Sequence, residues 1–316
     1  HGHGTHCAGI AAANGPELKG VAPDADLLAV KVLNAGGSGS SSDIIAGIEF
    51  SVAQGADVIS MSLGGPGDAN DDMSAAVDNA VKNGVICVVA AGNDGPGSFT
   101  IGSPGCARLA ITVGASDKTD NIAYFSSRGP SNAVSGLKPD LLAPGVAIYS
   151  STPNDNYASW NGTSMATPHT AGAAALLRQI NPGWDPLVIK ASLMNKSVDL
   201  GYNVWEQGAG RMDVYASALT KSAAKPASLN FGIDDLTLDV WTEKDTFWIH
   251  NFRASDQTFD ISLDASFPAG IEVSIAPSNP LVPGSDSVMI VVELEVDNRI
   301  VPFPDSDPPA YSGYIV

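Results

Sequence analysis

The sequence of 316 residues predicts an α/β domain, a three-layer sandwich around a mostly parallel sheet, followed by a small all-β sandwich. Over the first two thirds, apolar runs typical of buried strands alternate with amphipathic helical stretches. From Pro226 onward, helical periodicity stops, and short alternating runs separated by turn clusters take over. The length is sufficient for one large and one smaller domain. We place them at residues 1–223 and 224–316.

In the first domain, predicted strands and helices follow one another closely. We expect strands at 27–32, 57–63, 85–90, 110–115 and 147–150, and another directly after Asp140. We expect helices at 43–54, capped by Ser41 or Ser42, and at 72–82, ending at Asn83-Gly84, where Gly can take the left-handed cap conformation. A loop rich in Asn, Tyr and Ser then leads into an apolar helix that opens at Thr163-Ser164.

The second domain contains only strand signals. They lie at 236–241, 246–250, 258–263, 271–276, 288–296 and 311–316. Turn clusters such as Pro277-Ser278-Asn279-Pro280 separate them, as in an antiparallel sandwich. The last predicted strand reaches the final residue, so we expect the chain to be a piece of a longer protein.

Composition excludes some classes of function. The net charge of −18, from 34 acidic and 16 scattered basic residues, argues against a nucleic-acid partner, because binding to phosphates needs clustered Lys and Arg. No run of eighteen apolar residues occurs, so we expect no membrane span. Three cysteines, Cys7, Cys87 and Cys106, leave at least one free thiol within the chain. Cys87 lies in an apolar run and is expected in the core.

Three short runs carry chemistry. His3-Gly4-Thr5-His6 supplies an imidazole, and Gly162-Thr163-Ser164-Met165-Ala166-Thr167-Pro168-His169 supplies a hydroxyl at the start of a helix. A serine held against an imidazole becomes a nucleophile at neutral pH. Between them, Ala90-Ala91-Gly92-Asn93-Asp94-Gly95 places Asn93 after a strand, at the sheet edge where α/β proteins bind ligands. Its amide can donate to a developing oxyanion.

These runs, in this order, resemble those of the subtilisin-like serine proteases (peptidase S8 type), from residue 1 to about Ala218. The resemblance implies peptide-bond hydrolysis through an acyl-enzyme, with Ser164 as nucleophile, His3 as general base and Asn93 as oxyanion donor. It also implies a secreted, extracellular enzyme that acts on protein or peptide substrates, carries a propeptide upstream and requires no cofactor. Structural calcium stays unassigned, because the stretch 11–20 is short where many relatives bind it.

The resemblance also implies a substrate-binding cleft. In this family an extended peptide adds between two segments of the enzyme as an extra strand. Gly37-Ser38-Gly39 matches the family's edge strand and Ser62-Leu63-Gly64 its second such strand, and the specificity pocket is walled by Ser62-Leu63-Gly64 and Ala90-Ala91-Gly92. No acidic residue is indicated at the pocket base, so we expect large apolar or aromatic side chains before the cleaved bond.

One departure from the family is large. In this family the triad follows the order Asp, His, Ser, and here the His motif comes first, so we expect the Asp upstream. Asp24 and Asp26 lie in a turn, and Asp140 precedes a strand with no reason to face His3. We therefore expect residues 1–316 to be a fragment that is nearly inactive by itself.

Other hypotheses fit the sequence less well. His1, His3 and His6 lie close together, but the zinc motif H-E-x-x-H is absent, so we expect no metal site. Ser164 could be only a helix cap. An α/β-hydrolase needs its His far after the Ser, and His169 follows on the same helix.

The remaining alternative is a non-catalytic binding protein that keeps the fold and binds through the C-terminal sandwich. Residues 224–316 weakly resemble part of the fibronectin type III-like domains that follow the catalytic domain of some larger relatives. Such a domain would act as a stabilising spacer or bind carbohydrate or surfaces.

Overall fold

The computed structural model describes residues 1–131, 136–234, 236–304 and 310–316. The chain separates into two compact units, His1–Ala218 and Leu219–Val316, which we describe one at a time. The predicted boundary between residues 223 and 224 falls inside strand β7 (Ser222–Lys225), which pairs with a strand of the second unit. A boundary cannot divide a hydrogen-bonded strand, so β7 belongs to the second unit.

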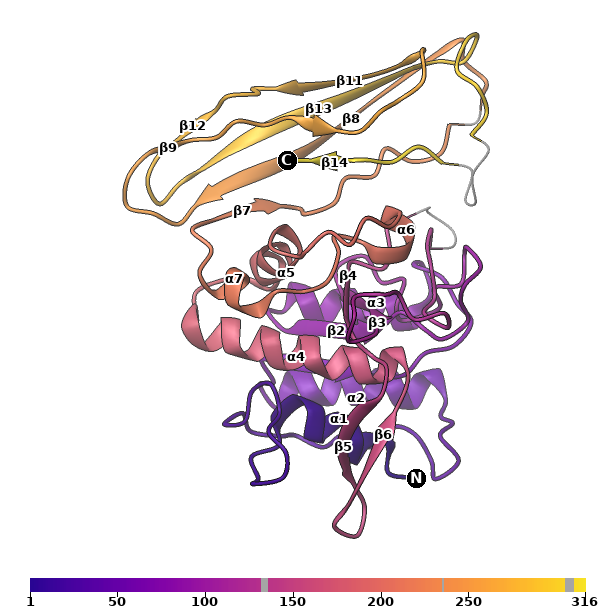
Figure 1. Cartoon of the computed structure of the whole chain (residues 1–316), viewed down its shortest axis with the longest axis vertical. Helices are drawn as coiled ribbons and strands as arrows, with labels where there is room; N and C mark the ends of the chain where they lie inside the picture. The colour runs from indigo at the N-terminus through magenta and orange to yellow at the C-terminus, as the bar shows by residue number, and fades with distance from the viewer. Residues whose placement is uncertain (132–135, 235, 305–309) are drawn as a thin grey trace. The chain divides into compact units, whose positions relative to one another are not determined.

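The first unit is built on a parallel sheet with strand order β1-β2-β3-β4, of which β2, β3 and β4 are labelled in Figure 1. The strands are β1 (Val58–Met61), β2 (Ile86–Ala90), β3 (Ile111–Ser116) and β4 (Leu141–Pro144). β2 and β3 are buried along their whole length, which explains their continuous apolar sequence. Parallel pairing places the carboxyl ends of β1 and β2 side by side, with Met61 opposite Val89.

Helices cover the sheet. Residues of α2 (Ser41–Ala53) and α3 (Asp72–Lys82) form one core cluster with Met61 of β1 and with Cys87 and Val89 of β2. Alternate strand residues point to the other face. The long helix α4 (Thr163–Ile180) contacts all four strands, and α1 (His3–Ala12) packs on α4. The remaining helices are α5 (Pro186–Asn195), α6 (Val204–Gln207) and α7 (Val214–Ala218).

Several predicted elements differ from the structure. Residues 27–32 form no strand, although Val32 packs against the cluster of α2 and α3. Apolar alternation favours a strand, but a strand also needs a hydrogen-bonded neighbour, and Leu27 and Leu28 are half exposed. The N-cap of α2 is Ser40, whose hydroxyl accepts from the N–H of Asp43 at 3.2 Å, and not Ser41 or Ser42.

The chain between β4 and α4 forms an antiparallel hairpin. β5 (Ile148–Thr152) overlaps the strand predicted at 147–150, and it pairs with β6 (Asn156–Trp160), which forms where the sequence predicts a loop. The hairpin packs on α1 through Ile148 and Trp160, which join Ile10 and Met165 in a small apolar cluster. It thus connects the sheet to the start of α4.

The second unit is antiparallel. Its main sheet has the order β11-β13-β8-β7, with β8 (Val240–Asn251), β11 (Ile271–Ala276) and β13 (Ser287–Asp297). Two shorter pairs join β9 (Gln257–Thr258) to β12 (Leu281–Val282), and β10 (Leu263–Asp264) to β14 (Tyr314–Ile315). Of the predicted strand 236–241 only residues 240 and 241 are in a strand, and they form one strand, β8, with the predicted strand 246–250, because the polar residues between them also pair with β13. The buried centre of this unit consists of Phe247, Ile249, Val282, Ile290 and Val292.

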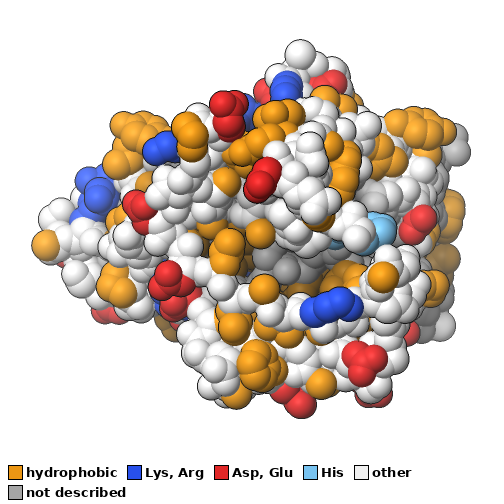
Figure 2. All heavy atoms as spheres, turned by 90° about the horizontal axis from the view of Figure 1, so that it is seen from below, with side chains coloured by type: hydrophobic (Ala, Val, Ile, Leu, Met, Phe, Trp, Pro, Cys, Tyr) orange, Lys and Arg blue, Asp and Glu red, His pale blue; other side chains and the backbone are white. Residues whose placement is uncertain are grey.

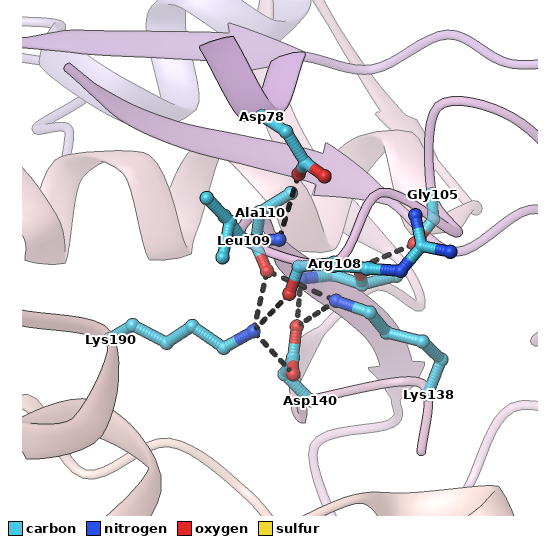
Figure 3. A network of polar contacts seen from close by, with 9 residues as sticks. Asp78, Gly105, Arg108, Leu109, Ala110, Lys138, Asp140 and Lys190 are labelled. Carbon is cyan, nitrogen blue, oxygen red and sulfur yellow. Dashed lines mark hydrogen bonds and ion pairs between the residues drawn. The ribbon is translucent and has the colours of Figure 1, made fainter. Parts of the chain in front are cut away.

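A charged network is buried in the first unit (Figure 3). Asp140 lies just before β4, and its carboxylate accepts from Lys138 Nζ at 2.7 Å, from Lys190 Nζ of α5 at 2.8 Å and from the N–H of Thr112 at 2.7 Å. Both ammonium groups also donate to the carbonyl of Ala110. Burial raises the pKa of Asp140, and the two ammonium groups outweigh it, so that this pKa is lowered overall.

None of the helices in the described ranges has the length and apolar character that crossing a membrane requires. Cys7, Cys87 and Cys106 are free thiols. Cys87 is in the core as predicted, and burial raises its pKa to about 12.

Candidate active site

His3 is the first residue of α1. Gly2 precedes it with φ +85°, and a Cβ there would lie 2.8 Å from Pro153 Cδ of the β5–β6 hairpin, so the position requires glycine. The pKa of His3 is lowered below its ordinary value of 6.5, mainly by burial and to a smaller extent by the charge of nearby His6. The imidazole is therefore neutral at pH 7 and able to accept a proton. Its Nδ1 lies 3.9 Å from Cys7 Sγ, one turn along the helix.

Ser164 lies in the first turn of α4. Its Oγ donates to the carbonyl of Ser62 at 3.4 Å, and its own carbonyl accepts from Cys7 Sγ at 3.4 Å. Cys7 therefore contacts both His3 and Ser164, and the structure brings these two sequence-distant residues to one place. α4 has no side-chain N-cap, and the N–H groups of its first turn carry the positive end of the helix dipole.

Asn93 follows β2 and is held against the start of α4. Its Oδ1 accepts from the backbone N–H of Thr163 at 2.9 Å and from Thr163 Oγ1 at 3.1 Å. A backbone N–H can only donate, so this contact fixes which end of the amide faces Thr163. The NH₂ group of Asn93 is therefore the end that remains free to donate, next to the residue that precedes Ser164.

The backbone before Asn93 is specialised. Gly92 has φ +112°, and a Cβ there would lie 2.7 Å from Ser127 Oγ. The N–H of Gly92 donates to Thr163 Oγ1 at 3.3 Å, and Ser127 Oγ accepts from the N–H of Asp94 at 3.1 Å. These bonds fix the main chain on both sides of Asn93.

Two of the predicted substrate-binding segments leave neighbouring strands at the same sheet edge. Ser62-Leu63-Gly64 follows β1, and Ala90-Ala91-Gly92 follows β2. Ala91 is buried in an apolar cluster with Ala69, Ile101 and Cys106. The side chains that pack against Ala91 are therefore apolar.

The third predicted segment, Gly37-Ser38-Gly39, is not a strand. The side chain of Asn34 accepts from the N–H groups of Gly36 and Ser38, and the N–H of Gly37 donates to the carbonyl of Asn34. These bonds make a turn at the point where an edge strand was expected. The turn lies near His1, since a Cβ on Gly37 would be 3.9 Å from His1 Nε2.

Comparison with known proteins shows the family of this chain. The Subtilase family model matches residues 1–211. The chain belongs to the subtilase family. Subtilisin Savinase from Lederbergia lenta is 47% identical over 203 residues, covering 64% of this chain and 72% of that protein. Alkaline protease from Alkalihalobacillus alcalophilus is also 47% identical over 203 residues, and this chain spans about half of it, 51%. The solved structure of Sphericase has a TM-score of 0.61 at 38% identity, over 67% of this chain and 77% of that one.

In this subtilase, none of Asp24, Asp26 and Asp140 hydrogen-bonds to His3. Asp24 is exposed and accepts from Asn14 Nδ2, Asp26 is exposed, and Asp140 is occupied by its two lysines. Over the ranges that the structure describes, no carboxylate hydrogen-bonds to His3. The triad acid is thus not supplied by Asp24, Asp26 or Asp140.

Two other histidines of the subtilase, His6 and His169, are held by main-chain contacts. His6 is buried, its Nε2 faces the carbonyl of Ala158 at 3.0 Å, and its ring stacks on Trp160. His169 Nδ1 contacts the carbonyl of Met165 at 2.8 Å. Within the described ranges, no group of three or more His, Cys, Asp or Glu side chains is placed to hold a metal ion. Figure 2 shows a histidine side chain at the surface on the face that it views, with Lys and Arg side chains at several places on that face.

Sequence reasoning missed two residues that organise the site of the subtilase. Thr163 orients Asn93 through its N–H and its hydroxyl. Pro168 lies inside α4, four residues after Ser164. The second could have been found from the sequence, since a proline in a helix always leaves the carbonyl four residues earlier without its N–H partner.

Proposed function

We propose that this subtilase is a serine endopeptidase that works through an acyl-enzyme. Ser164 Oγ attacks the peptide carbonyl, His3 accepts the hydroxyl proton, and the same imidazole then gives that proton to the leaving amine. Water repeats the sequence on the acyl-enzyme and releases the acid. One observation carries the proposal: Cys7 Sγ lies 3.9 Å from His3 Nδ1 and 3.4 Å from the Ser164 carbonyl, so the proposed base and the proposed nucleophile contact the same side chain.

The oxyanion of each tetrahedral intermediate is stabilised from two sides in this proposal. One donor is the NH₂ group of Asn93, which Thr163 orients. The other is the N–H of Ser164, in the first turn of a helix of 18 residues, where the helix dipole favours negative charge.

We infer that the substrates are extended or unfolded proteins with large apolar or aromatic residues before the cleaved bond. The apolar cluster behind Ala91 supports this preference, because burial of an apolar side chain needs no charged partner there. Cleavage of a peptide library tests it. A strict preference for Arg or Lys before the cleaved bond would refute it.

Labelling with a fluorophosphonate tests the reaction itself, in the protein as its source makes it. We expect covalent modification at Ser164, found by mass spectrometry of the modified peptide. Ser164→Ala should abolish labelling, and Ser217→Ala, a buried serine of α7, should leave it unchanged. Absence of labelling in the folded protein would favour a binding protein that keeps the fold.

We also propose that residues 1–316 alone turn over slowly. The described residues give His3 no carboxylate to fix its tautomer, and loss of that aspartate alone lowers kcat about 3 × 10⁴-fold in subtilisin, a member of this family. Equal turnover of residues 1–316 and of longer forms of the protein would contradict this.

Family resemblance supports an extracellular location and synthesis with a propeptide. For the second unit we propose a fibronectin type III-like sandwich that stabilises the protease. Its antiparallel sheet and alternating burial support this. Secretion is tested by finding the mature protein in the medium.

A further inference from the structure

The carbonyl of Ser164 has lost its helical partner. In an α-helix, the carbonyl of each residue accepts from the N–H four residues later. Four residues after Ser164 comes Pro168, which lies inside α4 and has no N–H. A partly buried carbonyl without a donor is costly, so the site must satisfy this oxygen in another way.

Two side chains from other elements replace the missing donor. Ser62 Oγ, just after β1, donates to the Ser164 carbonyl at 2.8 Å, and Cys7 Sγ of α1 donates to it at 3.4 Å. A hydroxyl is a much stronger donor than a thiol, so Ser62 makes the principal bond. At the same time, Ser164 Oγ donates to the carbonyl of Ser62 at 3.4 Å. The two serines thus hold each other through two reciprocal contacts.

We propose that Ser62 is a positioning residue for the nucleophile, and that Pro168 frees the Ser164 carbonyl so that Ser62 can hold it. This inference rests on the proposed function. The bond connects the main chain of the nucleophile directly to a wall of the specificity pocket. A substrate aligned along Ser62-Leu63-Gly64 therefore keeps a fixed distance to Ser164 Oγ.

The hydrogen bond between Ser62 and Ser164 should affect the chemical step more than it affects substrate binding. Displacement of a reacting group by about 1 Å can reduce the rate about a hundredfold. Here the position of Ser164 is constrained by one neutral hydrogen bond, from Ser62 Oγ to the Ser164 carbonyl. Loss of the Ser62 hydroxyl should therefore lower the acylation rate about fivefold and leave KM within about twofold. A bond that only stabilises the fold would lower stability and leave the acylation rate unchanged.

The test is a double-mutant cycle in the full-length protein, with acylation measured from the burst of an ester substrate and active sites counted by fluorophosphonate. Ser62→Ala should slow acylation about fivefold. Pro168→Ala restores an N–H that can take the Ser164 carbonyl, so in that background Ser62→Ala should slow acylation less than twofold. Equal losses in both backgrounds would overturn the proposal.

A second pair keeps the test independent of Pro168. Ser62→Thr retains a hydroxyl, and Ser62→Val has nearly the same shape as the threonine variant but no hydroxyl. Only the valine variant should therefore show the fivefold lower acylation rate. Ser217→Ala is the matched control, because Ser217 Oγ donates to the Asp213 carbonyl at 2.7 Å, away from Ser164. It should lower stability with no change in acylation.

Equal acylation rates for the threonine and valine variants would refute the role of the hydroxyl. Labelling of the wild-type protein reports on the proposed function, whereas the differences among these variants report on Ser62. The two ideas can therefore fail separately.

Discussion

Replacement of Asp140 by asparagine should strongly destabilise the first unit. The carboxylate faces two ammonium groups, Lys138 and Lys190, whose side chains are only 5% and 11% exposed. Asp140→Asn keeps the shape but leaves two buried positive charges without a counter-charge (Figure 3). Removing one partner of a buried ion pair costs about 3–5 kcal/mol. For a unit of this size, His1–Ala218, that corresponds to a fall in Tm of about 10 °C.

Lys138→Met should behave differently. Burial lowers the pKa of Lys138 to about 8, the charge of Asp140 opposes this, and Lys190 adds to it. The network holds one negative and two positive charges, so loss of Lys138 leaves a balanced pair between Asp140 and Lys190. We expect Lys138→Met to change stability by less than about 1.5 kcal/mol.

The sign of the pH dependence follows from the same pKa. Lys138 in the unfolded chain titrates near 10.5 and in the folded unit near 8, so between these values the unfolded chain binds more protons. Stability should therefore rise as pH increases from about 8 to 10.5, by at most about 3 kcal/mol from this group. Lys138→Met should lack this rise.

Thermal and urea unfolding followed by circular dichroism measures these effects, in a Ser164→Ala background that prevents self-digestion. The difference between Lys138→Met and its parent at pH 7 and pH 10 isolates Lys138 from other titrating groups. A fall in Tm below about 2 °C for Asp140→Asn would refute the reasoning. So would equal losses for Asp140→Asn and Lys138→Met.

Three further predictions concern the active site. Asn93→Leu should lower kcat about 10²–10³-fold with little change in KM. Loss of an oxyanion donor has an effect of this size in subtilisin, a member of this family. An unchanged kcat would exclude Asn93 as a donor. Gly92→Ala should lower the free energy of unfolding of the first unit by about 1–3 kcal/mol, measured in urea, because Gly92 has φ +112° and its new Cβ would lie 2.7 Å from Ser127 Oγ. Unchanged stability would contradict this. A mercurial should partly inhibit the full-length enzyme through Cys7, which contacts His3, and Cys7→Ser should be resistant; inhibition that persists in Cys7→Ser would place the reactive thiol elsewhere.

The helices and strands that the sequence predicted best are those decided by local chemistry. The helix 72–82 coincides with α3, because Asp71 caps it and its apolar face repeats with helical period. The strand 271–276 coincides with β11, whose burial alternates along its length. By contrast, the strand expected at 27–32 did not form, and the loop expected before α4 became β6. A strand needs a hydrogen-bonded neighbour, which residues 27–32 do not have and which the nearby β5 supplies to β6.

The sequence by itself determined the family chemistry, since its motifs contain the imidazole, the hydroxyl and the amide in order. Only the tertiary structure decided how these groups are held. Asn93 is oriented by Thr163, and the Ser164 carbonyl is held by Ser62 and Cys7, residues up to 157 positions away. A hydrogen bond acts over about 3 Å, so its partner is chosen by the folding of distant segments onto one another and not by sequence spacing.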